Sequence, residues 1–304
     1  MTKPSTFRIW WTAARPHTLT ASISPIIVAT SRLRHPNYRA VVLWTLFCTT
    51  VQLGANLHND YADFVQGTDN DKRVGQKRAT AQGWWTPRQT CVATCSVVSV
   101  TALAGVLLAF ETGQETNLFY WFLIGTSLFN AFAYTGGPFP LGWMLGNKSI
   151  AYSGLGEFFV LIYFGLVAVC MLPYCLGEAQ LPWMEAWQIG LLATNILVVN
   201  NIRDRHTDVE ANKRTTAVRF GRSFALVEYQ MCLGGAYALS LYKWTTITGL
   251  RVSASMCLLP LLSIPLALAE LRGVSTKEGS NLTPHVGKAA LLQRVFSVLL
   301  SLQP

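Results

Sequence analysis

Long stretches without a charged side chain alternate with short polar connections along the chain. Five stretches contain no Asp, Glu, Lys or Arg: residues 40–59, 89–110, 116–147, 158–177 and 252–269. A helix needs about 20 mostly apolar residues to cross a bilayer, and several of these stretches meet that length. Shorter apolar segments become long enough where flanking Lys and Arg side chains extend toward the membrane surface. The pattern therefore predicts an all-α fold, a multi-pass membrane bundle of about nine transmembrane helices.

The predicted helices are residues 14–31, 40–58, 89–110, 118–135, 157–176, 186–202, 224–243, 252–270 and 285–302. Three prolines lie inside predicted helices, which a membrane bundle tolerates because neighbouring helices satisfy the freed carbonyl groups. We expect a single integral-membrane domain that spans residues 1–304.

The basic residues indicate how the bundle is oriented. If the N-terminus is cytoplasmic, the N-terminal segment and the even-numbered loops hold 18 of the 24 Lys and Arg residues. This asymmetry follows the positive-inside rule. The net charge of +9 therefore indicates membrane topology together with anionic membrane lipid or an anionic substrate. Nucleic-acid binding, which calls for a soluble basic face, is not indicated.

The Asp residues are gathered in two places, although only 13% of the chain is charged. All six Asp residues lie within residues 56–71 and 200–214, on two predicted cytoplasmic loops. Each cluster continues the end of a membrane helix, where carboxylates face the negative end of the helix dipole at a cost of about 0.3–1 kcal/mol each. A bound cation relieves both this penalty and the mutual repulsion, so the clusters predict metal sites.

Spacing and chemistry suggest the metal and its ligands. Asn56-x3-Asp60-x2-Asp63 resembles Asn200-x3-Asp204-x3-Asp208, and spacings of three and four place each trio on one helix face. Carboxylate and amide oxygens favour Mg²⁺, which takes one or two carboxylates and completes its shell with substrate phosphates. We therefore expect two facing clusters to hold a diphosphate through Mg²⁺.

Basic side chains beside both clusters support a phosphate ligand. Arg78 follows the first cluster, and Lys213 and Arg214 follow the second. Arg presents a planar fork to phosphate oxygens and Lys a point charge. In a membrane the natural diphosphate substrate is an isoprenoid, whose tail dissolves among the helices and whose diphosphate is a leaving group.

Several segments, in this order along the chain, resemble the UbiA superfamily of intramembrane aromatic prenyltransferases. NDYADFVQGTD (59–69) and NNIRDRHTD (200–208) are similar to the two Asp-rich motifs of that family. Further similar stretches are RPHT (15–18), YTGGPFPLG (134–142), GLGE (154–157) and KRTTAVRFG (213–221). The last third of the chain is similar in hydropathy alone.

Within the superfamily, the chain looks most like the members that prenylate 1,4-dihydroxy-2-naphthoate. Gly67 stands where ubiquinone-type enzymes commonly carry a third Asp, and GTD after NDYxD is the naphthoate-type pattern. The resemblance implies a nine-helix bundle, Mg²⁺ dependence, and attachment of a prenyl chain to the naphthoate ring with loss of CO₂ to give demethylmenaquinone.

The resemblance also implies roles for individual residues. The implied metal ligands are Asp60, Asp63, Asp204 and Asp208. Asp69 is expected to bind metal or to help deprotonate the aromatic substrate, Tyr134 to lie beside the reacting carbon, and Asp71 to be a loop charge. The implied diphosphate-binding and supporting residues are Arg15, Asn56, Arg78, Asn200, Lys213 and Arg214.

Other readings stay open at this point. The same chemistry with a phytyl tail, or with hydroxybenzoate or homogentisate as acceptor, uses similar motifs. A membrane transporter is the alternative from another class of protein, and it predicts acids at mid-helix depth. The chain departs from the family in the insertion WMLGNKSIA (143–151) and in Glu157, where Asp is frequent. A bacterial inner membrane is expected, with a plastid membrane as the alternative; tail length and oligomeric state are open.

Overall fold

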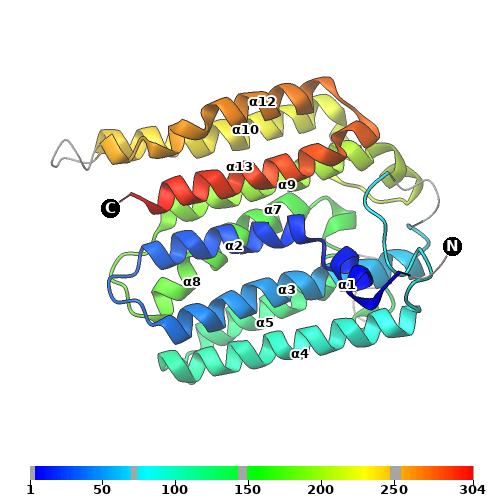
Figure 1. Cartoon of the computed structure of the whole chain (residues 1–304), viewed down its shortest axis with the longest axis horizontal. Coiled ribbons are helices and arrows are strands. Elements are labelled where there is room, and N and C mark those ends of the chain that lie inside the picture. The colour runs from blue at the N-terminus through cyan, green and yellow to red at the C-terminus, as the bar shows by residue number, and fades with distance from the viewer. Residues whose placement is uncertain (1–3, 70–73, 143–148, 247–254, 304) are drawn as a thin grey trace.

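The computed structural model describes residues 4–69, 74–142, 149–246 and 255–303. Their helices run alongside one another as a bundle, with the two chain termini at opposite ends (Figure 1). The α-helices are α1 Thr6–Ala14, α2 Pro16–Ser31, α3 Tyr38–Val65, α4 Pro87–Thr112, α5 Leu118–Ala133, α7 Gly156–Val160, α8 Ala168–Cys175, α9 Trp183–Glu210, α10 Thr216–Thr246, α12 Ile264–Thr276 and α13 Thr283–Ser301. Short helices are η1 Ala151–Ser153, η2 Leu161–Val167, η3 Leu259–Ser263 and η4 Gly279–Leu282.

The all-α prediction is confirmed, since the described residues are helical or irregular and each predicted segment overlaps a helix. Within the part of the chain that the structure describes, three helical segments are long and apolar enough to cross a membrane: Tyr38–Val65, Pro87–Thr112 and Gly156–Cys175. Thr18–Ser31 and Leu118–Ala133 are shorter apolar helices. The number of nine spans therefore stays a prediction.

The N-terminal segment differs from the sequence expectation. It forms a separate helix, α1, before the break at Arg15, whose φ of 51° is left-handed. Pro16 then begins α2, where its fixed φ suits the first helical turn and its missing N–H is not needed.

The two acidic segments are helical extensions of α3 and α9, and Gly67 ends the first of them. The N–H of Gly67 bonds the Phe64 carbonyl, and the N–H of Thr68 bonds the Asp63 carbonyl. This is a Schellman motif, which requires a left-handed residue, and the φ of Gly67 is +74°. The turn reverses the chain and brings residues 68 and 69 back toward the end of α3.

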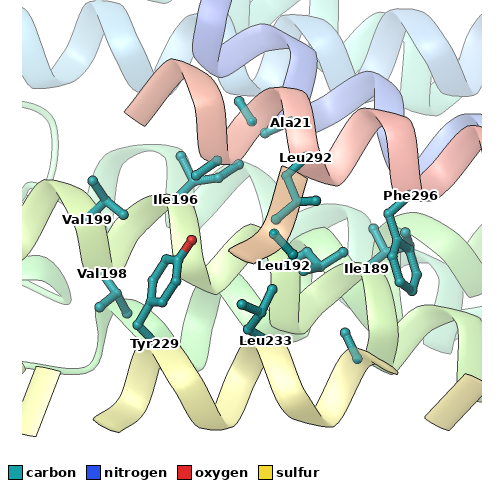
Figure 2. Close-up of a cluster of buried hydrophobic side chains, with 14 of the residues drawn as sticks. Ala21, Ile189, Leu192, Ile196, Val198, Val199, Tyr229, Leu233, Leu292 and Phe296 are labelled. Carbon is teal, nitrogen blue, oxygen red and sulfur yellow. The ribbon is translucent and has the colours of Figure 1, made fainter. Parts of the chain in front are cut away.

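A close contact between two glycines positions α9. A Cβ on Gly165 of η2 would lie 2.6 Å from the Ala186 carbonyl oxygen, and one on Gly190 would lie 2.7 Å from the Leu161 carbonyl oxygen. Small residues let membrane helices approach to backbone contact in this way. On its other sides α9 packs through Ile189, Leu192 and Ile196 into the core that it shares with α2, α10 and α13 (Figure 2).

The outward faces of α4 and α5 carry large apolar side chains. Leu103, Phe110 and Phe122 are 57%, 67% and 62% exposed. A soluble monomer rarely presents such a face to water, whereas lipid accommodates it without cost. The periphery is thus built for a membrane, and the polar chemistry lies inside the bundle.

Replacing Gly67 should destabilise the protein according to how well the new residue accepts a left-handed backbone. Gly67→Val should lower the unfolding free energy by about 1–2 kcal/mol and Gly67→Asn by less, because Asn tolerates this conformation. Thermal unfolding in detergent measures the difference. Equal melting temperatures for the two variants would show that backbone strain at this turn is unimportant.

Candidate active site

A cavity of ≈ 290 Å³ runs through the bundle between α2, α3, α5, α9 and the α7–η2–α8 rod. Its lining on α3 follows a helical stripe: Trp44, Phe47, Cys48, Val51, Gln52, Ala55, Asn56, Asn59 and Asp63. One end of the stripe is aromatic and apolar, and the other end is polar. At 1.5 Å per residue, the rise from Trp44 to Asp63 is about 28 Å. The cavity therefore joins a charged end to a long apolar wall.

The stripe separates the two acids of the first cluster. Asp63 lines the cavity, and so does Asn59, one turn before it. Asp60 is not among the lining residues, and its two carboxylate oxygens accept the backbone N–H groups of Ala79 at 2.9 Å and Thr80 at 3.2 Å. The structure thus directs Asp60 and Asp63 to different partners.

The second cluster approaches the first, as the sequence predicted. Asn200 and Asp204 line the cavity from α9. Asp63, Asp204 and Asp208 also line one small polar cleft beside it. The carboxylate of Asp204 accepts two hydrogen bonds from the Arg203 guanidinium, at 2.7 and 2.6 Å.

Arg78 lies between the acids. Its guanidinium is 2.8 Å from Asp63 and 3.2 Å from Asp69, and its side chain is 5% exposed. Burial by itself would lower the pKa of Arg78, but the carboxylates of Asp63 and Asp69 outweigh this effect and the pKa is raised. Arg78 is therefore a permanent cation at the polar end of the cavity, and Asp69, which the sequence singled out, is held beside it.

Tyr152 also contacts Asp63 and was not predicted from the sequence. Its hydroxyl donates to Asp63 at 3.1 Å and lies 2.6 Å from the hydroxyl of Thr68. Burial, and then the charge of Asp63, raise the pKa of Tyr152, so the phenol keeps its proton. The ammonium of Lys213 lies 6.0 Å from the centre of the ring.

The basic residues of the second cluster separate in the structure. Lys213 lines the cavity and is 3.5 Å from Asp208. Burial raises the pKa of Asp208 to about 6, opposed by Lys213. Arg214 is exposed and lies outside both the cavity and the cleft; its backbone N–H bonds the Tyr152 carbonyl. The structure thus brings one of the two adjacent cations to the site.

Asn56 ties the N-terminal segment to the cavity wall. Its amide donates to the Ala14 carbonyl and to the Thr18 hydroxyl, both at 3.0 Å. These bonds span the break between α1 and α2, at which Arg15 lines the cavity. Asn56 therefore positions Arg15 in this structure.

Tyr134 also lines the cavity, at the end of α5. Trp84 and Trp85, in the loop between α3 and α4, instead pack with Ile9, Ala13 and Leu57 in a separate apolar cluster. Tyr134 is thus the predicted aromatic residue that reaches the cavity.

Glu157, the departure from the family pattern, joins three helices. It accepts hydrogen bonds from Asn201 and Thr216, both at 2.6 Å. Asn201 lines the cavity beside Asn200. The longer acid thus holds α7, α9 and the start of α10 together at the polar end. Asp71 and most of the 143–151 insertion lie outside the described residues.

The acidic and amide side chains at the polar end of the cavity fit Mg²⁺ together with a phosphate ligand. Among the described residues, no three or more His, Cys, Asp or Glu side chains gather closely enough to hold a metal ion by themselves. Mg²⁺ normally takes one or two carboxylates and fills its shell with water and substrate phosphates. Asp63, Asp204 and Asp208, which line one cleft with amide oxygens near them, suit a metal that a diphosphate helps to hold.

Asn59, which was not predicted as a site residue, left a signal in the sequence. Asn59-x3-Asp63 has the same spacing as Asn200-x3-Asp204, and so does Asn56-x3-Asp60. Tyr152 left no such signal, because it reaches Asp63 from 89 residues further along the chain.

Solved structures place this fold in a class of helical membrane proteins. A UbiA homolog from Archaeoglobus fulgidus, bound to DMAPP and Mg²⁺, superposes with a TM-score of 0.65 at 14% identity, covering 97% of this chain and 99% of that one. A UbiA homolog from Aeropyrum pernix, without ligand, gives a TM-score of 0.66 at 14% identity over 94% and 96% of the two chains. The fold is therefore that of the UbiA-type membrane bundle.

Sequence comparison gives the family. The model of the UbiA prenyltransferase family matches residues 18–281. The 1,4-dihydroxy-2-naphthoate octaprenyltransferase of Mycobacterium leprae is 31% identical over 303 residues, covering 97% of this chain and 95% of the relative. The enzyme of the same name from Escherichia coli is 30% identical over 299 residues, covering 95% and 94%. The chain belongs to the UbiA prenyltransferase family.

Removing the Tyr152 hydroxyl should weaken the site without unfolding the protein. A hydrogen bond to a charged group contributes about 1.5–3 kcal/mol, so Tyr152→Phe should lower prenyl-transfer kcat/KM by about tenfold or more. Tyr163→Phe, on the apolar part of the cavity wall, is the matched control. Wild-type activity in Tyr152→Phe would contradict the role of this hydroxyl.

Proposed function

We propose that this protein transfers a polyprenyl group from an isoprenoid diphosphate to 1,4-dihydroxy-2-naphthoate, with release of diphosphate and CO₂ to give demethylmenaquinone in its reduced, quinol form. The observation that carries the proposal is the cavity, whose charged end lies between the two acidic segments and whose wall is apolar. Relatives with that octaprenyltransferase name, similar over nearly the whole chain, support the choice of substrates.

The two ends of the cavity suit the two parts of a prenyl diphosphate. An apolar wall about 28 Å long along α3 suits an extended isoprenoid tail. At the polar end, Arg78, Lys213 and Arg15 offer cationic contacts to the phosphate oxygens. In the proposed complex Arg78 and Lys213 exchange carboxylate partners for phosphate oxygens, which frees carboxylate oxygens for metal coordination.

We assign the metal to the polar end. Asp63, Asp204 and Asp208 would hold Mg²⁺, with Asn59 and Asn200 as neighbouring amide donors. Bound there, Mg²⁺ would neutralise charge that develops on the departing diphosphate.

The remaining steps use residues of this chain. The C–O bond of the diphosphate breaks, its electron pair leaves with the phosphate oxygen, and Arg78 and Lys213 stabilise the new negative charge. The Tyr134 ring faces the allylic cation, an attraction of about 2 kcal/mol when desolvated. The ring carbon that bears the carboxylate forms the new C–C bond, and loss of CO₂ returns an electron pair to the ring. The enclosing bundle excludes water, which would otherwise capture the cation.

We place the acidic segments on the cytoplasmic side of a bacterial inner membrane. The distribution of Lys and Arg over the loops supports this orientation. Both substrates then reach the polar end of the cavity, the aromatic acid from the cytoplasm and the prenyl diphosphate from the bilayer.

The proposed reaction is tested with membranes from an expressing host that lacks the enzyme. Membranes with 1,4-dihydroxy-2-naphthoate, a polyprenyl diphosphate and Mg²⁺ should form a prenylated naphthoquinone, detected by mass spectrometry. Phytyl diphosphate and hydroxybenzoate serve as competing donor and acceptor. Excess EDTA should abolish the product; undiminished product would contradict metal dependence, and no product with either donor would contradict the reaction.

Removing one carboxylate charge from either cluster should lower kcat/KM more than removing a remote carboxylate charge does. Asp63→Asn and Asp204→Asn should each lower kcat/KM at least a hundredfold, because each takes a ligand from the metal. Glu115→Gln, an exposed acid in the α4–α5 loop, is the charge-matched control. Membrane levels of all variants should match the wild type, and an active variant would remove its residue from the metal site.

A further inference from the structure

Asp60 has a set of contacts that the proposed reaction does not use. It is 1% exposed, and it lies about 100° around α3 from Asn59, off the stripe that lines the cavity. Both of its carboxylate oxygens are occupied by backbone donors, Ala79 at 2.9 Å and Thr80 at 3.2 Å. These contacts aim the carboxylate at the loop after α3 and not at the other acids.

The segment that Asp60 holds is here named the Arg78 loop (residues 74–86), and it contains a turn at residues 79–83. The N–H groups of Gln82 and Trp84 bond the carbonyls of Arg78 and Ala79, at 3.0 and 2.9 Å. The first N–H groups of such a turn lack partners within it, and an acid placed there both caps them and complements the local dipole. Asp60 supplies this cap from a neighbouring helix.

The rest of the loop is fixed on its other side. Ala79 and Thr80 are 0% and 2% exposed, and the Thr80 hydroxyl lies 2.7 Å from that of Thr90 on α4. Without the Asp60 carboxylate, two buried N–H groups would lose their acceptors, which costs free energy. The loop would have to move to give these groups new partners.

The capped residues come directly after Arg78. Arg78 reaches Asp63 at 2.8 Å, and Asp63 lies three residues after Asp60 on α3, a rise of about 4.5 Å. One rigid helix therefore carries both the anchor of the loop and the carboxylate that the loop's arginine contacts. Displacement of the anchor changes where the guanidinium lies relative to Asp63.

We propose that Asp60 is a positioning residue and not a metal ligand: it anchors the Arg78 loop so that Arg78 is held at the diphosphate end of the cavity. The anchoring itself is independent of the reaction. Its consequence for substrate binding rests on the proposed function, in which Arg78 contacts the diphosphate.

Hydrogen–deuterium exchange tests the anchor directly. In Asp60→Asn and Asp60→Ala, peptides that cover residues 74–86 should exchange at least tenfold faster than in the wild type, and Asp63→Asn should leave them protected. Asp60→Asn keeps one acceptor oxygen, so it serves if the alanine variant does not fold. Wild-type exchange in the Asp60 variants would overturn the anchor, whatever their activity.

The metal alternative is tested by Mg²⁺ titration of the melting temperature, with inorganic diphosphate at a concentration that saturates every variant, so that weaker diphosphate binding does not change the Mg²⁺ dependence. The half-saturating Mg²⁺ concentration should be unchanged in Asp60→Asn and at least tenfold higher in Asp63→Asn. A tenfold increase in Asp60→Asn would make Asp60 a ligand and overturn the proposal. In the prenyl-transfer assay, Asp60→Asn should raise the KM for the prenyl diphosphate at saturating Mg²⁺. Since exchange and melting need no turnover, failure of the proposed reaction is distinguishable from failure of the anchor.

Discussion

Carboxylates placed at the C-terminal ends of two membrane helices are the constraint on which this structure depends. Each faces the negative end of a helix dipole at the edge of an apolar bundle, where an uncompensated charge is costly. Three of them have a cation: Asp63 has Arg78, Asp204 has Arg203 and Asp208 has Lys213. Two of these cations come from the loops that follow α3 and α9, so charge compensation draws the loops over the end of the bundle. The same arrangement gathers acids and cations where a diphosphate and its metal need them.

Helix packing places the two acidic ends together. The contact of Gly165 with Gly190 brings the α7–η2–α8 rod against α9, and Glu157 links that rod to Asn201. Since α3 and α9 are long helices, a small tilt would move their ends by several ångströms. Backbone-level contact along α9 limits this motion, and the Schellman turn at Gly67 returns Thr68 and Asp69 to Asp63.

Much of this architecture could be predicted from the sequence, because charge-free stretches and bunched acids are local patterns. The helical segments are confirmed. Asp63, Asp204 and Asp208 line one cleft, and Lys213 and Tyr134 line the cavity, while the roles of these residues stay predictions. The separate α1 helix and the contacts of Tyr152 were beyond such patterns, and the number of spans stays a prediction. A phenol from a distant loop depends on how helices pack, which no spacing along the chain encodes.

Asn59 and Asp60 show where the boundary lies. By itself the sequence determined that α3 is a helix, that its end carries acids and that one face of it meets the second cluster, since these follow from apolar length and residue type. Spacings of three and of four both fit one helix face, so Asp60 and Asn59 were equal candidates for the position before Asp63. The tertiary structure decided between them, because the Arg78 loop packs against one side of α3 and the cavity lies on the other.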